Sequence, residues 1–176
     1  MGGSADTFIG TAATSGVTVD GGGGNDSITG GSGADSLIGG SSNDSLSGGA
    51  GNDTLDGGSN NDTLTGGAGN DLLDGGSGTD RAVYAGPASN FTVTLSGSNV
   101  IVADTVGGEG TDTLTGIEQI AFNGVVYDLR LGTSGVDSIG DTGGSPDFVV
   151  AGDGNDGITG TAGSDTMFGG SGNDVL

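Results

Sequence analysis

The sequence predicts an all-β solenoid, a fold in which short strands and turns stack as coils along one axis. Seven nine-residue repeats follow one another without interruption over residues 21–83. Each repeat places an Asp at its sixth position and an apolar residue at its eighth. Glycine supplies 44 of the 176 residues and proline only two, a composition that suits closely spaced turns. A fixed period of this length indicates stacked units that contact only their neighbours.

Each repeat is expected to form one turn and one very short strand. Positions one to six read Gly-Gly-x-Gly-x-Asp, and five of the seven repeats keep this hexad in full. Glycine at position four allows positive φ, while glycine at positions one and two leaves the backbone carbonyls unobstructed. Side chains alternate between the two faces of a strand, so only the eighth residue points inward. These inward residues are Ile28, Leu37, Leu46, Leu55, Leu64, Leu73 and Ala82.

Two repeats, or 18 residues, are expected to make one coil, which places alternate repeats above one another. The sixth-position aspartates then line two edges of the solenoid. One edge carries Asp26, Asp44, Asp62 and Asp80, and the other carries Asp35, Asp53 and Asp71. Carboxylates and free carbonyls of adjacent coils meet at both edges. Six to eight oxygens at about 2.3–2.6 Å are what Ca²⁺ takes, whereas Mg²⁺ dehydrates reluctantly.

Charge and composition also favour a hard metal ion as the partner. The formal net charge is -21, and Arg81 and Arg130 are the only basic residues. All but two of the 23 acidic residues are Asp, which indicates a geometric role for the short carboxylate. Self-repulsion should keep the bare chain expanded until cations bind. The charge excludes nucleic acid and anionic membranes as partners, and the absence of Cys and His excludes disulfides, the usual zinc sites and His-based triads.

The hexad followed by x-U-x, where U is apolar, resembles the calcium-binding RTX (hemolysin-type) repeats of secreted bacterial proteins. The resemblance implies a right-handed parallel β-roll that holds several calcium ions between successive turns on each edge. The candidate ligands in the regular repeats are the seven aspartates named above. The accompanying turn glycines are Gly21, Gly24, Gly30, Gly33, Gly39, Gly48, Gly51, Gly57, Gly66, Gly69, Gly75 and Gly78.

Two repeats depart from the hexad, because Ser42 and Asn60 replace the fourth glycine. Both substitutions fall on the edge that carries Asp44 and Asp62. Asn tolerates the left-handed conformation moderately and Ser less well. We therefore predict weaker calcium sites on this edge than beside Asp35, Asp53 and Asp71.

The sequence divides into three parts. Residues 1–83 form a first β-roll, degenerate over 1–20, where Asp6 holds the sixth position of one unit and Ser15 that of the next. Residues 84–131 break the period, and residues 132–176 form a second roll segment. Only the last unit of the second segment keeps the full hexad, and its candidate ligands are Asp137, Asp147, Asp156, Asp165 and Asp174.

The middle part, residues 84–131, contains four of the seven aromatic residues and predicts two β-hairpins. Residues 91–95 and 100–103 flank a Ser-Gly-Ser-Asn turn, and residues 117–122 and 125–129 flank Asn123-Gly124. This part resembles β-rich modules found between RTX blocks and is expected to cover the end of the first roll. Its aspartates, Asp104, Asp112 and Asp128, are expected to be solvated at turns and strand ends.

These features predict an extracellular bacterial module that folds on calcium and serves as the secretion and folding appendage of a type I-secreted protein. We expect no cleavable signal peptide and no membrane span, because residues 1–19 lack a basic and an apolar region and no stretch approaches ~18 apolar residues. An enzyme is disfavoured, because the carboxylates are periodic and a catalytic pair should be unique. The alternative is a calcium-dependent matrix, surface-layer or adhesin scaffold that self-associates head to tail.

Overall fold

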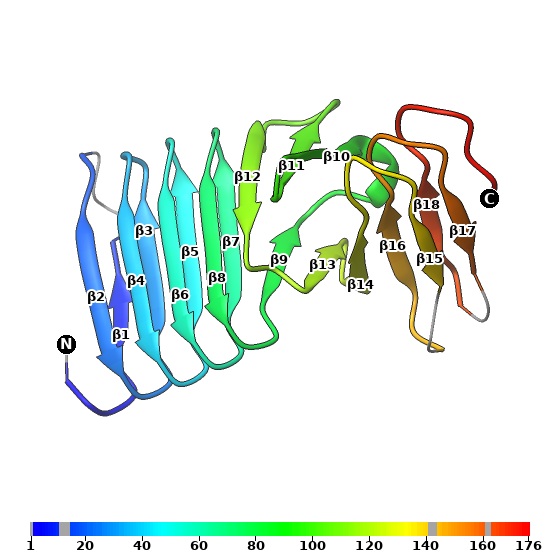
Figure 1. Ribbon diagram of the computed structural model, residues 1–176. Coiled ribbons are helices and arrows are strands. Elements are labelled where there is room, and N and C mark those ends of the chain that lie inside the picture. The colour runs from blue at the N-terminus through cyan, green and yellow to red at the C-terminus, as the bar shows by residue number, and fades with distance from the viewer. Residues whose placement is uncertain (1, 11–14, 141–143, 161–162) are drawn as a thin grey trace.

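The computed structural model describes residues 2–10, 15–140, 144–160 and 163–176 and shows a parallel β-solenoid, as the repeats predict. Coils follow one another along a single axis from the N-terminus to the C-terminus (Figure 1). Within the described ranges the only helix is a 3-10 turn, Ala88–Asn90. The strands of the regular repeats are β2 (Thr18–Gly23), β3 (Ser27–Gly31), β4 (Ser36–Ser41), β5 (Ser45–Ala50), β6 (Thr54–Ser59), β7 (Thr63–Ala68), β8 (Leu72–Ser77) and β9 (Arg81–Tyr84).

The strands alternate between two parallel sheets, with one coil of 18 residues between neighbours in a sheet. Even-numbered strands β2, β4, β6 and β8 pair in order in one sheet, and odd-numbered strands β3, β5, β7 and β9 pair in the other. The register joins Leu37 to Leu55 and Leu46 to Leu64, so equivalent positions lie directly above one another. The strand β1 (Thr7–Ile9) extends the second sheet at its N-terminal edge by pairing with β3.

The eighth-position side chains form the core between the two sheets. All seven, Ile28, Leu37, Leu46, Leu55, Leu64, Leu73 and Ala82, are at most 1% exposed. Burying one Leu or Ile side chain contributes roughly 1.5–3 kcal/mol. Two facing ranks of such residues, one from each sheet, therefore hold the coils together, because glycine-rich turns bring no apolar surface of their own.

Both hairpins predicted between the arrays are present. The strands β10 (Phe91–Ser96) and β11 (Asn99–Asp104) pair antiparallel around Gly97-Ser98, and β13 (Gln119–Phe122) pairs antiparallel with β14 (Val125–Leu131). Asn123 and Gly124 join β13 to β14 with φ values of 49° and 79°. Positive φ at both residues is what a two-residue turn of this kind requires, and Asn-Gly accommodates it well.

The middle segment also resumes the solenoid, which its irregular spacing conceals. The strand β12 (Thr111–Thr115) pairs parallel with β8, and β13 pairs parallel with β9. Leu114 lies beside Leu73 and Ile120 beside Ala82, so each extends the core by one further coil. Residues 111–122 therefore continue both sheets beyond the regular repeats.

The C-terminal segment joins the same structure through β14. This strand pairs parallel with β16 (Asp147–Val150), which pairs with β18 (Thr166–Phe168), so one nine-stranded sheet runs from β1 to β18. The strands β15 (Ser138–Gly140) and β17 (Gly157–Thr159) form a separate two-stranded sheet (Figure 1). Five aromatic rings in successive contact, Tyr84, Phe91, Phe122, Tyr127 and Phe148, fill the core around the hairpins.

Candidate metal sites at the two edges of the solenoid

Each edge of the solenoid carries a ladder of aspartates joined by backbone hydrogen bonds. The N–H of Asp44 donates to Oδ1 of Asp62 at 2.7 Å, and the N–H of Asp35 donates to Oδ1 of Asp53 at 2.8 Å. The structure brings together the aspartates that the 18-residue period places on each edge. One ladder contains Asp26, Asp44, Asp62 and Asp80, and the other contains Asp35, Asp53 and Asp71.

The second carboxylate oxygen of every ladder aspartate is buried without a hydrogen-bond partner. The seven side chains are between 0% and 3% exposed, and Oδ2 of each has no partner among the described residues. A buried carboxylate oxygen left unpaired is strongly unfavourable, so charged groups of this kind are normally paired or bound to metal. Seven such atoms in register therefore indicate that cations belong at both edges.

The unpaired oxygens converge with backbone carbonyls at the first glycine of each repeat. A Cβ on Gly57 would lie 2.7 Å from Asp62 Oδ2 and 2.8 Å from the carbonyl oxygen of Gly75. The same arrangement joins the Asp of the same repeat to a glycine carbonyl of the next coil at four further positions, Gly21, Gly30, Gly39 and Gly48. Carboxylate and carbonyl oxygens are the ligands of Ca²⁺. This set of oxygens thus fits calcium. We call the space between the carboxylate oxygen and the carbonyl oxygen the cradle, and any side chain in place of these glycines would fill it.

The remaining ligands would come largely from the backbone. Within the described ranges no group of three or more acidic side chains comes together in a form that could hold a metal. The two cationic side chains lie against other partners: Arg81 donates to Oε1 of Gln119 at 2.7 Å, and Arg130 contacts Asp147 at 3.4 Å. Both contacts lie outside the seven ladder carboxylates of the regular repeats.

The fourth glycine of each turn has a different function, because it lets adjacent coils approach each other closely. A Cβ on Gly51 would lie 2.5 Å from the carbonyl oxygen of Gly33, and Gly69 and Gly78 face the preceding coil in the same way. Gly24 and Gly69 take φ values of 100° and 134°. Ser42 and Asn60, which replace the fourth glycine in two repeats, also have positive φ values of 86° and 77°, although they carry side chains.

Burial raises the pKa values of five ladder carboxylates. It is the largest cause at Asp44, Asp53, Asp71 and Asp80, where a hydrogen bond from the stacked backbone N–H opposes it and neighbouring carboxylates add to it. The pKa of Asp62 rises to about 6 for the same reasons. Without a cation, these carboxylates therefore resist ionisation inside the folded solenoid.

The C-terminal segment repeats the ladder over fewer coils. The N–H groups of Asp137, Asp147 and Asp156 donate to Oδ1 of Asp156, Asp165 and Asp174, respectively, at 2.9–3.1 Å. Asp147 and Asp156 are 1% exposed, and Oδ2 of Asp156 has no hydrogen-bond partner among the described residues. Asp137, Asp165 and Asp174 are half-buried, and Asp137 Oδ2 already accepts the Thr133 N–H at 2.7 Å.

Sequence reasoning missed Asp112, which extends the ladder of Asp35, Asp53 and Asp71. The expectation that Asp112 is solvated is wrong: its side chain is 1% exposed, and its Oδ1 accepts the N–H of Asp71 at 2.9 Å. Burial, opposed by that hydrogen bond, raises the pKa of Asp112 to about 7. The signal was present, because residues 110–116 read Gly-x-Asp-x-Leu-x-Gly, as do residues 51–57. Asp104 and Asp128 lie at strand positions outside the ladders.

Comparison with known proteins connects these sites to a family. No curated protein matches the chain. Among solved structures, the extracellular lipase LipA from Serratia marcescens is 21% identical over 86% of this chain, with a TM-score of 0.30. The chain spans 27% of that lipase's length. No described helix is long and apolar enough to cross a membrane.

The model of the RTX calcium-binding nonapeptide repeat matches residues 20–55, 47–82 and 141–176, which together make up more than half of the chain. These segments contain both the regular ladders and part of the C-terminal one. The chain therefore belongs to the RTX calcium-binding nonapeptide repeat family.

Proposed function

We propose that the chain is a structural module that folds when its turns bind calcium. One observation carries the proposal: seven buried aspartates each present one oxygen that has no hydrogen-bond partner among the described residues. When bound, calcium supplies positive charge and open coordination positions to carboxylate and carbonyl oxygens. The aspartates hold these oxygens in place, because Oδ1 of each accepts a backbone N–H from the preceding coil.

The folding mechanism is linkage between metal binding and compaction. A cation that binds only the stacked turns stabilises them by mass action, and it also cancels repulsion between carboxylates. Extracellular calcium modules bind at about 10⁻⁴–10⁻³ M, a range that separates the cytosol from the exterior. The module would thus remain unfolded before export and condense outside a bacterial cell, as the folding appendage of a type I-secreted protein. Neighbouring coils share ladder bonds, which makes the response cooperative.

We propose no catalytic function for the chain. The buried carboxylates recur in one register along both edges, whereas a catalytic acid and base need distinct environments. Calcium is the ligand that the site chemistry favours, and the net charge of -21 opposes a nucleic-acid partner.

Sedimentation velocity in EDTA and in millimolar calcium tests the proposal, with magnesium as the control cation. We expect an expanded monomer in EDTA and in magnesium, and a compact species in calcium. An unchanged sedimentation coefficient in calcium would refute calcium-dependent folding. Growth with protein concentration in calcium would support the head-to-tail scaffold, in which the sheets of two copies would pair edge to edge.

A further inference from the structure

We call the ladder of Asp26, Asp44, Asp62 and Asp80 the Asp26 edge. The last turn of this edge is built from a segment outside the nonapeptide repeats. Asp80 is 0% exposed, and its Oδ2 is buried without a partner among the described residues. No nonapeptide follows Asp80 directly in the chain, since β9 leads into the hairpin segment. The oxygens that complete this turn must therefore come from elsewhere.

The segment after the β10–β11 hairpin supplies a carbonyl at the equivalent position. At Gly57 the cradle is formed by Asp62 Oδ2 and the carbonyl of Gly75. At Gly75 it is formed by Asp80 Oδ2, 2.9 Å from the point where a Cβ would lie, and by the carbonyl of Gly116. Gly116 thus replaces the first glycine of the missing repeat, although it lies 41 positions beyond Gly75 in the sequence.

Glu118 takes the hydrogen-bonding position of the ladder aspartate, although its side chain is exposed rather than buried. Its Oε2 accepts the N–H of Asp80 at 2.8 Å, as Asp80 Oδ1 accepts the N–H of Asp62 at 2.7 Å. One residue separates Gly116 from Glu118, whereas four separate Gly75 from Asp80. The turn is shorter by three residues, and the longer side chain of Glu spans the distance that Asp covers in a full turn. The carbonyl of Asp80 accepts the N–H of Gln119 at 2.9 Å and so fixes the pairing.

We propose that Asp80, the Gly116 carbonyl and Glu118 form a calcium site that ties the resumed coil, residues 110–122, to the first array. The inference rests on the proposed function, because it requires that the unpaired Oδ2 atoms bind calcium. It adds a ligand that lies outside the nonapeptide repeats. It also gives the site a specific consequence, since the metal joins two segments separated by the hairpin of β10 and β11.

The test compares Glu118→Gln with the matched control Glu109→Gln, which removes the same charge from the other glutamate of the chain. Glu109 accepts the Ala85 N–H and takes no part in the Asp26 edge. The readouts are calcium ions bound per chain at fixed free calcium, and hydrogen exchange of residues 111–122 and 27–47. We expect Glu118→Gln to lose one bound ion and the protection of residues 111–122, while residues 27–47 stay protected as in Glu109→Gln.

Glu118→Asp provides a second variant that keeps the charge. The shortened turn needs the longer side chain, so Glu118→Asp should also lose the ion, which a purely electrostatic role would not predict. If the unaltered protein bound no calcium, the proposed function itself would fail. If it bound calcium and protected residues 27–47, but both Glu118 variants matched Glu109→Gln, only the present inference would be overturned.

Discussion

The backbone N–H of Asp71 donates a 2.9 Å hydrogen bond to Oδ1 of Asp112, across a sequence separation of 41 residues. The equivalent bond from Asp53 to Asp71 spans 18 residues, so the ladder accommodates 23 additional residues, 87–109, within one turn. The cost of closing a loop grows only slowly with its length. An insertion at the edge therefore leaves the coil intact, because the ladder bonds and the inward leucines re-form on its far side.

Removing a shared ladder carboxylate should weaken calcium-dependent folding more than removing a terminal one. Asp53 is 2% exposed, accepts the Asp35 N–H and leaves Oδ2 unpaired. Asp6 is half-buried, and its Oδ2 already accepts the Gly2 N–H at 3.0 Å. We expect Asp53→Asn to raise the calcium midpoint of folding, measured by far-UV circular dichroism, well above that of the control Asp6→Asn. Equal midpoints would contradict the assignment of ladder residues as ligands.

In EDTA, acid should favour the folded solenoid. The folded-state pKa of Asp62 is about 6, raised from 3.8 mainly by burial. A group with a raised folded-state pKa binds protons more tightly in the folded form, so its stabilising effect is present at low pH and lost as pH rises through about 6.

We therefore expect the β-sheet signal in EDTA to increase as the pH is lowered from 7 toward about 4, near the unfolded-state pKa of 3.8. Calcium binding to the acid-folded solenoid at about pH 5, below the folded-state pKa of about 6 for Asp62, should release protons, which a weakly buffered titration with a pH electrode measures. A folded signal that instead increased with rising pH in EDTA would show that these carboxylates are not buried together without metal.

Replacing Ser42 or Asn60 by Gly should strengthen the calcium response. Both residues have positive φ, 86° and 77°, where a side chain costs about 1–2 kcal/mol, less for Asn. The greater flexibility of unfolded glycine offsets part of this gain. We expect Ser42→Gly to lower the calcium midpoint more than Asn60→Gly does. The reverse substitution Gly69→Ser, at φ 134° and against the Gly51 carbonyl, should raise it.

The unaltered protein tests whether the Asp26 edge binds calcium more weakly than the edge of Asp35, Asp53 and Asp71. Site-resolved occupancy, followed by NMR of the turn amides during a calcium titration, should show Asp35, Asp53 and Asp71 filling first. Simultaneous filling of both edges in the unaltered protein would disprove the difference.

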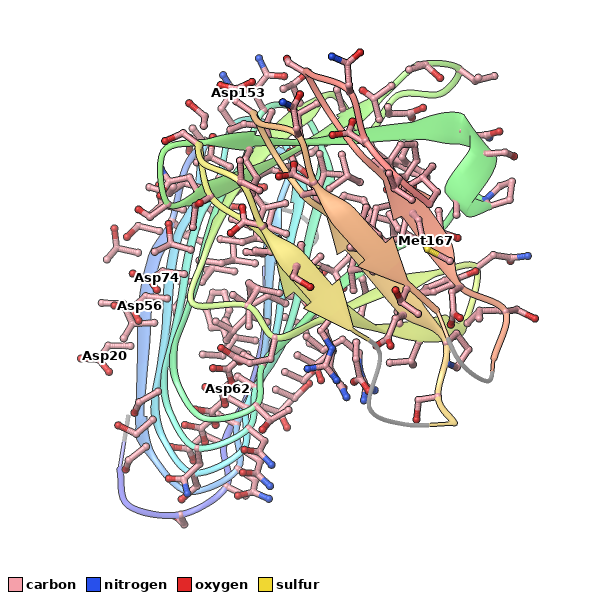
Figure 2. All side chains as sticks on the ribbon, turned by 45° about the vertical axis from the view of Figure 1, so that its right-hand side comes forward. Asp20, Asp56, Asp62, Asp74, Asp153 and Met167 are labelled. Carbon is pink, nitrogen blue, oxygen red and sulfur yellow. The ribbon has the colours of Figure 1, made fainter. Side chains whose placement is uncertain are left out.

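Neutralising Asp56 should stabilise the calcium-loaded solenoid. Asp56 lies directly beside Asp74 in the register of β6 and β8, and both lie on the outer face of that sheet (Figure 2). Burial, and then the Asp74 carboxylate, raise the pKa of Asp56. Like charges directly opposite one another destabilise a sheet. Asp56→Asn should thus raise the free energy of unfolding, and less so at high salt.

Asp20 provides the matched control for this experiment, since its register partner is Ile38 rather than an acidic residue. Asp20→Asn, measured by the same denaturant titration in saturating calcium, should change stability less than Asp56→Asn. A stabilisation of equal size in both variants would assign the effect to overall net charge instead of the pair.

The repeats predict the regular coils well because one physical requirement recurs at each position. Leu55 must be buried between sheets and Gly57 must leave room for two oxygens, so sequence period and structural period coincide. The same reasoning fails for Asp112 and Glu118, since the insertion hides the spacing of the first and the shortened turn changes the residue type of the second. Their positions depend on pairing of β12 with β8 and of β13 with β9, which is a long-range property.

The hairpin segment has a further consequence for how the stack finds its alignment. Identical coils could slide past one another by a whole repeat, because Leu46 would meet an apolar partner in either position. Tyr84 and Phe122, whose ring centroids lie 5.5 Å apart, occur at one level of the stack only. A slipped pairing would separate these rings and expose Phe122, which is 1% exposed in the aligned solenoid. The aromatic contact thus selects a single alignment from among those that the repeats alone would permit.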